Sequence, residues 1–191
     1  MGAQSLADVG AAASSCRLCP LWEGKTLVFG SGDPNAELMF IGEGPGELED
    51  ELGEPFVGVS GVLLSGMLCE VGIRREAVYL ANVIKHRPVT GHIPPKNRHP
   101  SPSEIAACMP WLNEQIRLVN PRLIIPLGEI PMGRFLDGGY KITEVHGQRF
   151  SWRDRAVLPT FHPSYVLRNQ RKLTLYRQDF RTIRRMLDAS I

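Results

Sequence analysis

Glycines and acidic residues alternate in one short segment of this sequence, IGEGPGELEDELGEPFVGVSG at residues 41–61. The segment has six glycines, no lysine or arginine, and six carboxylates, at Glu43, Glu47, Glu49, Asp50, Glu51 and Glu54. A carboxylate can activate a water molecule or stabilise developing positive charge. Glycines let the main chain approach a flat ligand or a sugar–phosphate strand closely. We expect most of these carboxylates to be solvated and one or two to take part in catalysis.

The segment does not fit the common nucleotide-binding loops. Glu47 occupies the last glycine position of the dinucleotide pattern G-x-G-x-x-G, and no G-K-[ST] sequence follows. So many carboxylates would also repel a polyphosphate unless a metal ion lay between them. The glycines are therefore interpreted as space for a closely approaching ligand.

Cysteine and histidine residues indicate a second site. Cys16-x2-Cys19 has a recurrent metal-ligand spacing, because a tight turn directs both sulfurs at one point. Cys108 adds a third thiol, and His86 could supply a fourth ligand or could be an exposed loop histidine. Cys69 lies in the apolar pattern of a predicted helix and is interpreted as a buried structural thiol.

These residues lie on an alternating series of predicted strands and helices. Apolar runs at 37–41, 78–84, 122–128 and 156–161 predict buried parallel strands. Helices are predicted from Ser60 to Gly72, from the capping box at 101–104 toward Val119, and over 174–188; residues 148–159 predict a hairpin. The expected fold is one three-layer α/β domain spanning residues 1–191. In such folds ligands bind at the carboxyl ends of the strands, where GEGPG, NVIKHRP, GE and FHPS are found.

Composition limits the class of protein. Hydrophobic residues make up 43% of the 191 residues and charged residues 22%, which is typical of a globular domain. The sequence has no apolar run of about 18 residues and no features of a secretory signal, so we expect a protein of the cytoplasm. We also expect it to be a monomer. Net charge is +2, yet basic residues cluster between His162 and Arg185. This cluster is either a solvated helix face or a phosphate-contacting surface.

Four motifs in this order resemble the family 4 uracil-DNA glycosylases, which are iron–sulfur members of the uracil-DNA glycosylase superfamily. They are GEGPGELEDELGEPFVGVSGVLL, LANVIKHRP, NRHPSPSEIAAC and FHPSYVLR, behind the C-x2-C pair. The resemblance extends from about Cys16 to Leu187. It implies a three-layer αβα sandwich around a four-stranded parallel sheet. It also implies that the protein binds uracil-containing DNA, in association with the nucleoid. A 4Fe–4S cluster would be held by four cysteines.

The resemblance also assigns roles in the acidic segment. Uracil must leave the duplex to reach a pocket, and Phe56 matches the aromatic residue on which its ring stacks. Glu43 would orient or activate the attacking water and steady the cationic sugar, with Glu49 as a second acidic contributor. The main chain of three residues would lie against the extruded nucleotide: Gly44, Pro45 and Gly46.

Two later motifs complete the site that the resemblance implies. Asn82 would recognise uracil, because one carboxamide offers the donor and the acceptor that O4 and N3–H require. His162 would stabilise negative charge on uracil O2 as the glycosidic bond breaks. Ser164 and Arg168 would contact DNA phosphate. The implied reaction is dissociative: uracilate leaves, water adds to the sugar, and an abasic site remains.

The chain departs from the family pattern at two points. His86 stands where the family has a cysteine, so the implied ligands are Cys16, Cys19, His86 and Cys108, and the segment after His86 is longer than usual. A related branch that traps uracil-DNA covalently shares both features, and His92 and His99 are candidate nucleophiles here. Neither matches that branch's motif clearly, so turnover is the leading hypothesis. The alternatives are covalent capture and an iron–sulfur or zinc protein that binds nucleic acid without chemistry.

Overall fold

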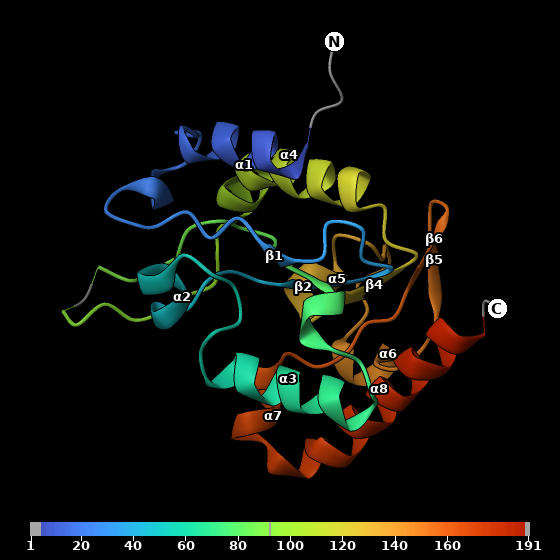
Figure 1. Ribbon diagram of the computed structural model, residues 1–191. Helices are drawn as coiled ribbons and strands as arrows, with labels where there is room; N and C mark the ends of the chain where they lie inside the picture. The colour runs from blue at the N-terminus through green and yellow to red at the C-terminus, as the bar shows by residue number, and fades with distance from the viewer. Residues whose placement is uncertain (1–4, 92, 190–191) are drawn as a thin grey trace.

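A computed structural model describes residues 5–91 and 93–189 of the chain (Figure 1). The strands of these residues are β1 (Ser31–Gly32), β2 (Leu38–Gly42), β3 (Tyr79–Asn82), β4 (Leu123–Pro126), β5 (Phe150–Trp152) and β6 (Arg155–Val157). They form one sheet in the order β1-β3-β2-β4-β6-β5. β3, β2, β4 and β6 are parallel, whereas β1 and β5 pair antiparallel at the two edges.

The central parallel strands therefore match the prediction, but the expected total of four strands is wrong. β5 is the first strand of the predicted hairpin and extends the sheet beyond β6. β1 has two residues, Ser31 and Gly32, and no apolar run that the hydrophobic pattern could have revealed.

Helices cover both faces of the sheet. The α-helices are α1 (Leu6–Ser14), α2 (Glu47–Leu52), α3 (Val59–Glu70), α4 (Pro102–Val119), α5 (Glu129–Met132), α6 (Ile142–Val145), α7 (Pro163–Arg168) and α8 (Leu173–Asp188); the 3-10 helices are η1 (Pro20–Trp22), η2 (Arg75–Ala77) and η3 (Gln170–Lys172). In Figure 1, α1 and α4 lie on one side of the sheet and α3, α7 and α8 on the other. This arrangement is the predicted three-layer sandwich.

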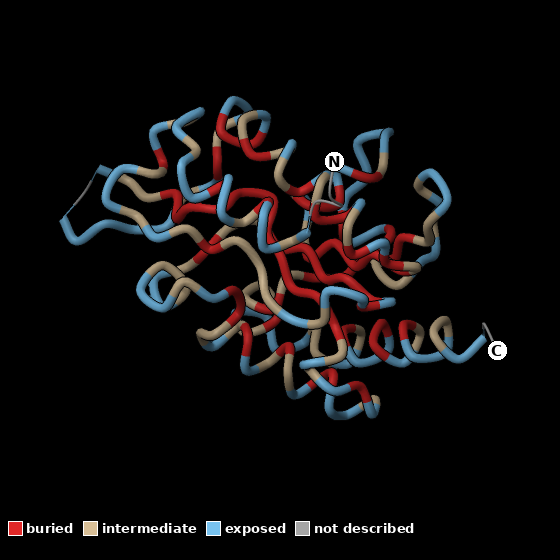
Figure 2. Tube along the Cα trace, turned by 45° about the horizontal axis from the view of Figure 1, so that its top comes forward, coloured by how far each residue is buried: buried red, intermediate tan, exposed pale blue. Residues whose placement is uncertain are grey.

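The two faces of β2 contribute to two different hydrophobic cores. Leu38 and Phe40 pack with residues of α3 and α8, whereas Met39 and Ile41 pack with residues of α4. Because successive side chains of a strand point to opposite faces, a strand buried on both faces is apolar throughout. Figure 2 shows the buried residues concentrated along the central strands. No helix of residues 5–91 and 93–189 is long and apolar enough to span a membrane.

Helix α4 begins and ends as predicted, with Ser101 and Glu104 forming the capping box. Helix α3 differs, because its N-cap is Gly58 and not Ser60. Cys69, predicted to be buried, is exposed: it lies on the side of α3 opposite Leu64 and Leu68, which face the core. The acidic segment also contains a helix that the glycine pattern did not predict, α2, which ends at Gly53 in a left-handed conformation (φ 72°).

Candidate active site

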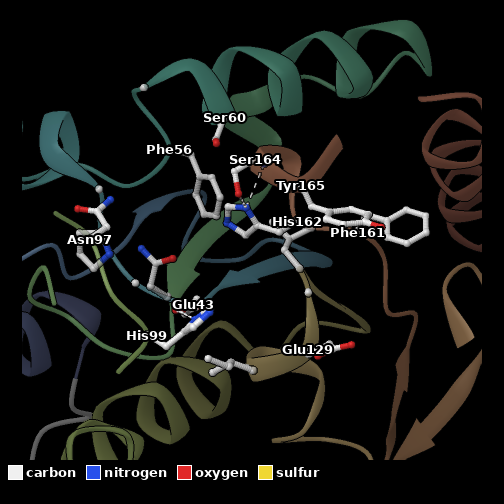
Figure 3. Close-up of a pocket in the computed structure, with 18 of the residues that line it drawn as sticks. Glu43, Phe56, Ser60, Asn97, His99, Glu129, Phe161, His162, Ser164 and Tyr165 are labelled. Carbon is white, nitrogen blue, oxygen red and sulfur yellow. Dashed lines mark hydrogen bonds and ion pairs between the residues drawn. The ribbon is translucent and has the colours of Figure 1, made fainter. Parts of the chain in front are cut away.

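A cavity of about 900 Å³ opens at the carboxyl ends of the parallel strands. We call it the rim pocket (Figure 3). All ten residues predicted to be catalytic or to bind substrate line it: Glu43, Gly44, Pro45, Gly46, Glu49, Phe56, Asn82, His162, Ser164 and Arg168. These residues come from segments separated by more than a hundred positions in the sequence, and the fold brings them together.

The ends of β2 and β3 place Glu43 and Asn82 side by side. Gly42 pairs with Asn82 in the parallel register, and the main-chain N–H of Ile84 donates to the carbonyl of Glu43 (3.1 Å). A Cβ atom at position 42 would overlap Oδ1 of Asn82 and lie 2.7 Å from the Phe56 ring. Glycine at this position therefore allows an aromatic ring and a carboxamide to meet over the strand end.

Phe56 is held in an unusual backbone conformation beside the pocket. Its φ of 56° lies in the left-handed region, which is rare for a bulky residue and costs conformational energy. The Arg75 guanidinium donates to the carbonyls of Pro55 and Phe56, both at 3.0 Å. The strain is therefore compensated by an anchored main chain, and the ring is 6% exposed.

Glu49 holds the other side of this segment. Its Oε1 accepts hydrogen bonds from the main-chain N–H groups of Val57 (3.1 Å) and Gly58 (2.9 Å). Gly58 is the N-cap of α3, and the Glu49 carboxylate binds its N–H group and that of Val57, directly before the first turn of the helix. This carboxylate fixes the path of the segment that carries Phe56.

His162 is presented at the start of α7 with a defined tautomer. The main-chain N–H of Ser164 donates to Nδ1 of His162 (3.1 Å), and the Ser164 hydroxyl lies 2.8 Å from the same nitrogen. Burial lowers the pKa of His162 to about 4, so the ring is neutral near pH 7. Because Nδ1 accepts from the main chain, Nε2 carries the ring proton. Figure 3 shows the His162 and Phe56 rings close together, with centroids 6.4 Å apart.

His99 is a pocket residue whose direction the sequence did not reveal. Its Nδ1 lies 2.8 Å from Oε1 of Glu43, and the two side chains meet in Figure 3. Arg98 fixes this part of the chain through a bidentate pair with Glu104 on α4 and a hydrogen bond to the carbonyl of Val89. The other candidate nucleophile, His92, lies outside the described residues.

The basic C-terminal cluster divides into two parts. On α8, Arg177 pairs with Glu70 of α3 (2.9 Å) and Arg184 pairs with Asp188 (2.6 Å). Arg168 instead lines the rim pocket. Much of the charge on α8 therefore serves contacts within the protein, whereas Arg168 of α7 belongs to the lining of the rim pocket.

The family model of the uracil DNA glycosylase superfamily matches residues 29–187. The chain belongs to this superfamily. It is 48% identical over 158 residues to the type-4 uracil-DNA glycosylase of Thermotoga maritima, covering 81% of this chain and 79% of that protein. It is 37% identical over 190 residues to the type-4 enzyme of Archaeoglobus fulgidus, covering 94% and 92%. A type-5 uracil-DNA glycosylase of Thermus thermophilus is 30% identical over 156 residues, covering 64% of this chain and 68% of that protein.

A second, narrow pocket in this superfamily member contains all four predicted metal ligands, and we call it the cysteine pocket. It is lined by Cys16, Cys19, His86 and Cys108, together with Trp22, Trp111 and Lys85. The Trp111 indole N–H lies 3.4 Å from the Cys16 sulfur. Burial raises the pKa of the Cys108 thiol and lowers that of His86. His86 is buried, so the alternative of an exposed loop histidine is wrong.

The spacing of these donors bears on what the cysteine pocket could hold. A single ion requires its donors at about 2.0–2.3 Å from one point. Within the part of the chain that the structure describes, no group of three His, Cys, Asp or Glu residues could hold such an ion. In an iron–sulfur cluster each ligand binds a different iron, so the donors are spread more widely. Three thiols and one imidazole are ligands that suit either an iron–sulfur cluster or a zinc ion.

Proposed function

We propose that this protein excises uracil from DNA by hydrolysing the N-glycosidic bond, as the first step of base excision repair. The similarity of the chain to type-4 uracil-DNA glycosylases supports this proposal. The observation that carries it is the rim pocket itself, where an acid, an aromatic ring, a carboxamide and a neutral imidazole meet: Glu43, Phe56, Asn82 and His162. No nucleotide-phosphate loop is needed for this chemistry.

Base recognition is assigned to Phe56 and Asn82. The extruded uracil stacks on the Phe56 ring, and the Asn82 carboxamide pairs with O4 and N3–H. Cytosine presents a donor and an acceptor in the opposite order, so it would leave both groups of the carboxamide unpaired and is refused. The fixed position of Phe56 supports this assignment, because a stacking surface must be held in place before the base arrives.

His162 and Glu43 assist the breaking bond. The Nε2–H of neutral His162 donates to uracil O2 as negative charge develops there, which makes uracilate a better leaving group. Glu43 orients a water molecule for attack on C1′ and steadies the positive charge on the sugar. Glu49 contributes indirectly, because one of its oxygens is already bonded to the segment that carries Phe56.

Binding of the DNA strand is assigned to the mouth of the rim pocket. Gly44, Pro45 and Gly46 lie against the extruded nucleotide, while Ser164 and Arg168 contact phosphate. We propose that one chain is sufficient for this activity, because every assigned residue belongs to it, and that it acts on cytoplasmic, nucleoid-associated DNA.

We further propose that the cysteine pocket holds a 4Fe–4S cluster through Cys16, Cys19, His86 and Cys108. When bound, the cluster would cross-link the N-terminal segment, the segment after β3 and helix α4, which are otherwise joined by side-chain packing. Imidazole in place of one thiolate makes the site less negative and should raise its reduction potential.

The test is product formation on a uracil-containing single-stranded oligonucleotide in excess over enzyme, followed by alkali and a denaturing gel. Cleaved strands should exceed the number of enzyme molecules, and an oligonucleotide with thymine or cytosine in place of uracil should remain intact. The Glu43→Gln/His162→Ala variant serves as the control for contaminating activity. Equal cleavage by this variant, or no cleavage by the wild type, would refute the proposed function.

A second candidate function is covalent capture of uracil-DNA, and the position of His99 favours it. The imidazole lies 2.8 Å from the carboxylate assigned to the attacking water, so it could meet C1′ itself. The carboxylate could accept the imidazole proton while Nε2 attacks. On the same gel, before alkali, capture would give a shifted protein–DNA band that stops at one per enzyme. The band should vanish in His99→Ala, whereas turnover gives no such band.

A further inference from the structure

Lys85 is a lysine buried between the two pockets. Its side chain is 1% exposed, and its Nζ donates to the main-chain carbonyl of Asn82 (2.7 Å) and to Oε1 of Gln115 (2.5 Å). Burying an amino group is costly, and the cost is offset only by well-placed partners. Both recorded partners are neutral oxygens, so this lysine is not part of an ordinary buried ion pair.

Gln115 extends the contact into helix α4. It is fully buried, and its Nε2 donates to the carbonyl of Phe29 (2.8 Å) and to the Tyr79 hydroxyl (3.1 Å). Gln115 stands two helical turns after Cys108, on the same side of α4. The lysine thus joins the end of β3 to the helix that carries a proposed cluster ligand.

The segment that follows β3 is attached on both sides. Val83 and Ile84 donate their N–H groups to the carbonyls of Gly42 (2.8 Å), the last residue of β2, and of Glu43 (3.1 Å), which follows it. The main-chain carbonyl of Asn82 accepts a hydrogen bond from the Lys85 amino group. Within this turn, the side chain of Asn82 lines the rim pocket and that of His86 lines the cysteine pocket.

We propose that Lys85 is a positioning residue for base recognition: by holding the carbonyl of Asn82 it fixes the direction of the carboxamide, and it connects that direction to the cysteine pocket. This inference rests on the proposed function, because it assigns Asn82 to uracil. A lysine is suited to the task because its long stem crosses the apolar layer between helix and strand while its amino group binds two oxygens at once.

Replacing the amino group tests the idea at the level of binding. In Lys85→Met the carbonyl of Asn82 and Oε1 of Gln115 lose the donor they share, and the turn is free to rotate. Free uracil requires the carboxamide, whereas an oligonucleotide with a tetrahydrofuran abasic analogue does not. We expect the Kd for uracil to rise about tenfold, the factor for one hydrogen bond. The Kd for abasic DNA should change by less than about twofold.

Two control variants separate positioning from general destabilisation. Lys141→Met removes an exposed lysine, and Ile183→Ala weakens the core on the opposite face of the sheet. Calorimetry with uracil and with abasic DNA, the melting temperature and the iron content are measured for each. Ile183→Ala should lower the melting temperature without changing the ratio of the two Kd values. Gln115→Met keeps the hydrogen bond from Lys85 to the carbonyl of Asn82, so its Kd for uracil should rise only two- to threefold. This variant also replaces Lys85→Met in the comparison if Lys85→Met does not fold.

The outcomes distinguish this inference from the proposed function. If the wild type neither binds nor releases uracil, the proposed function fails and the inference fails with it. If the wild type binds uracil and both Lys85→Met and Gln115→Met bind it equally well, the positioning role is refuted and the function stands. An equal loss of uracil and abasic-DNA binding, in step with the melting temperature as in Ile183→Ala, would reduce Lys85 to a structural role and also refute it.

Discussion

The rim pocket and the cysteine pocket share one turn of the chain but differ in what holds their residues in place. In the rim pocket, Glu49, Arg75 and Ser164 fix the functional groups by hydrogen bonds to the main chain or to the ring they support. In the cysteine pocket, the one side-chain hydrogen bond to a cysteine sulfur recorded among the described residues joins Trp111 to Cys16. Hydrogen bonds within the polypeptide therefore hold the rim pocket, and we predict that the cysteine pocket depends on the 4Fe–4S cluster proposed for it.

This difference predicts that variants of the two pockets separate activity from stability. The largest effect is expected for Asn82→Ala, which should lower uracil excision on the order of 10²- to 10³-fold. Within residues 5–91 and 93–189 no hydrogen bond is recorded for its carboxamide, so its removal leaves no partner unpaired and the melting temperature should hold. Single-turnover kinetics and calorimetry measure both. A variant that is inactive because it is unfolded would contradict the assignment.

The matching change in the cysteine pocket is Cys108→Ser. Wild-type protein purified without oxygen should be brown, with about four irons per chain. The variant should lose the colour and unfold about 10 °C lower, the shift for roughly 3 kcal/mol in a chain of this size. Iron analysis and thermal denaturation decide the outcome. A native protein with one zinc and no iron would refute the cluster.

A smaller effect is expected when a methyl group is added where β2 ends. The Cβ of Gly42→Ala would collide with Asn82 and the Phe56 ring, so kcat/KM for uracil excision should fall about tenfold. Gly66→Ala is the matched control, because nothing lies within 4 Å of its added Cβ and alanine favours a helix. Equal activity of the two variants would mean that Asn82 and Phe56 can be displaced at the strand end without loss of function.

The last effect concerns pH. His162 has a folded-state pKa of about 4, below its ordinary value of about 6.5, so the unfolded chain binds the proton more readily. Its contribution to stability is therefore complete above pH 6.5 and is lost as the pH falls toward 4. The difference in unfolding free energy between wild type and His162→Leu should change within this window and stay constant above it. A constant difference throughout would indicate an exposed, ordinary histidine.

The sequence predicted the central strands because each is apolar on both faces, and it predicted the rim because parallel strands end on the same side. Its failures have local causes. Cys69 follows the apolar residues of α3 in sequence but lies on the other side of the helix. The direction of His99 depends on the bridge between Val89 and Asn97, which a single sequence does not specify. The sequence gives no sign that Lys85 is buried, because lysine is almost always exposed.

The arginines of α8 have a consequence for ionic strength. A protein binds DNA more weakly in salt in proportion to the counterions it displaces, with a slope of about −0.7 per phosphate contacted on a single strand. Arg177 and Arg184 are already neutralised by Glu70 and Asp188, so they displace few counterions. Despite an isoelectric point near 8.4, this protein should therefore lose less DNA affinity as salt rises than its number of basic residues suggests.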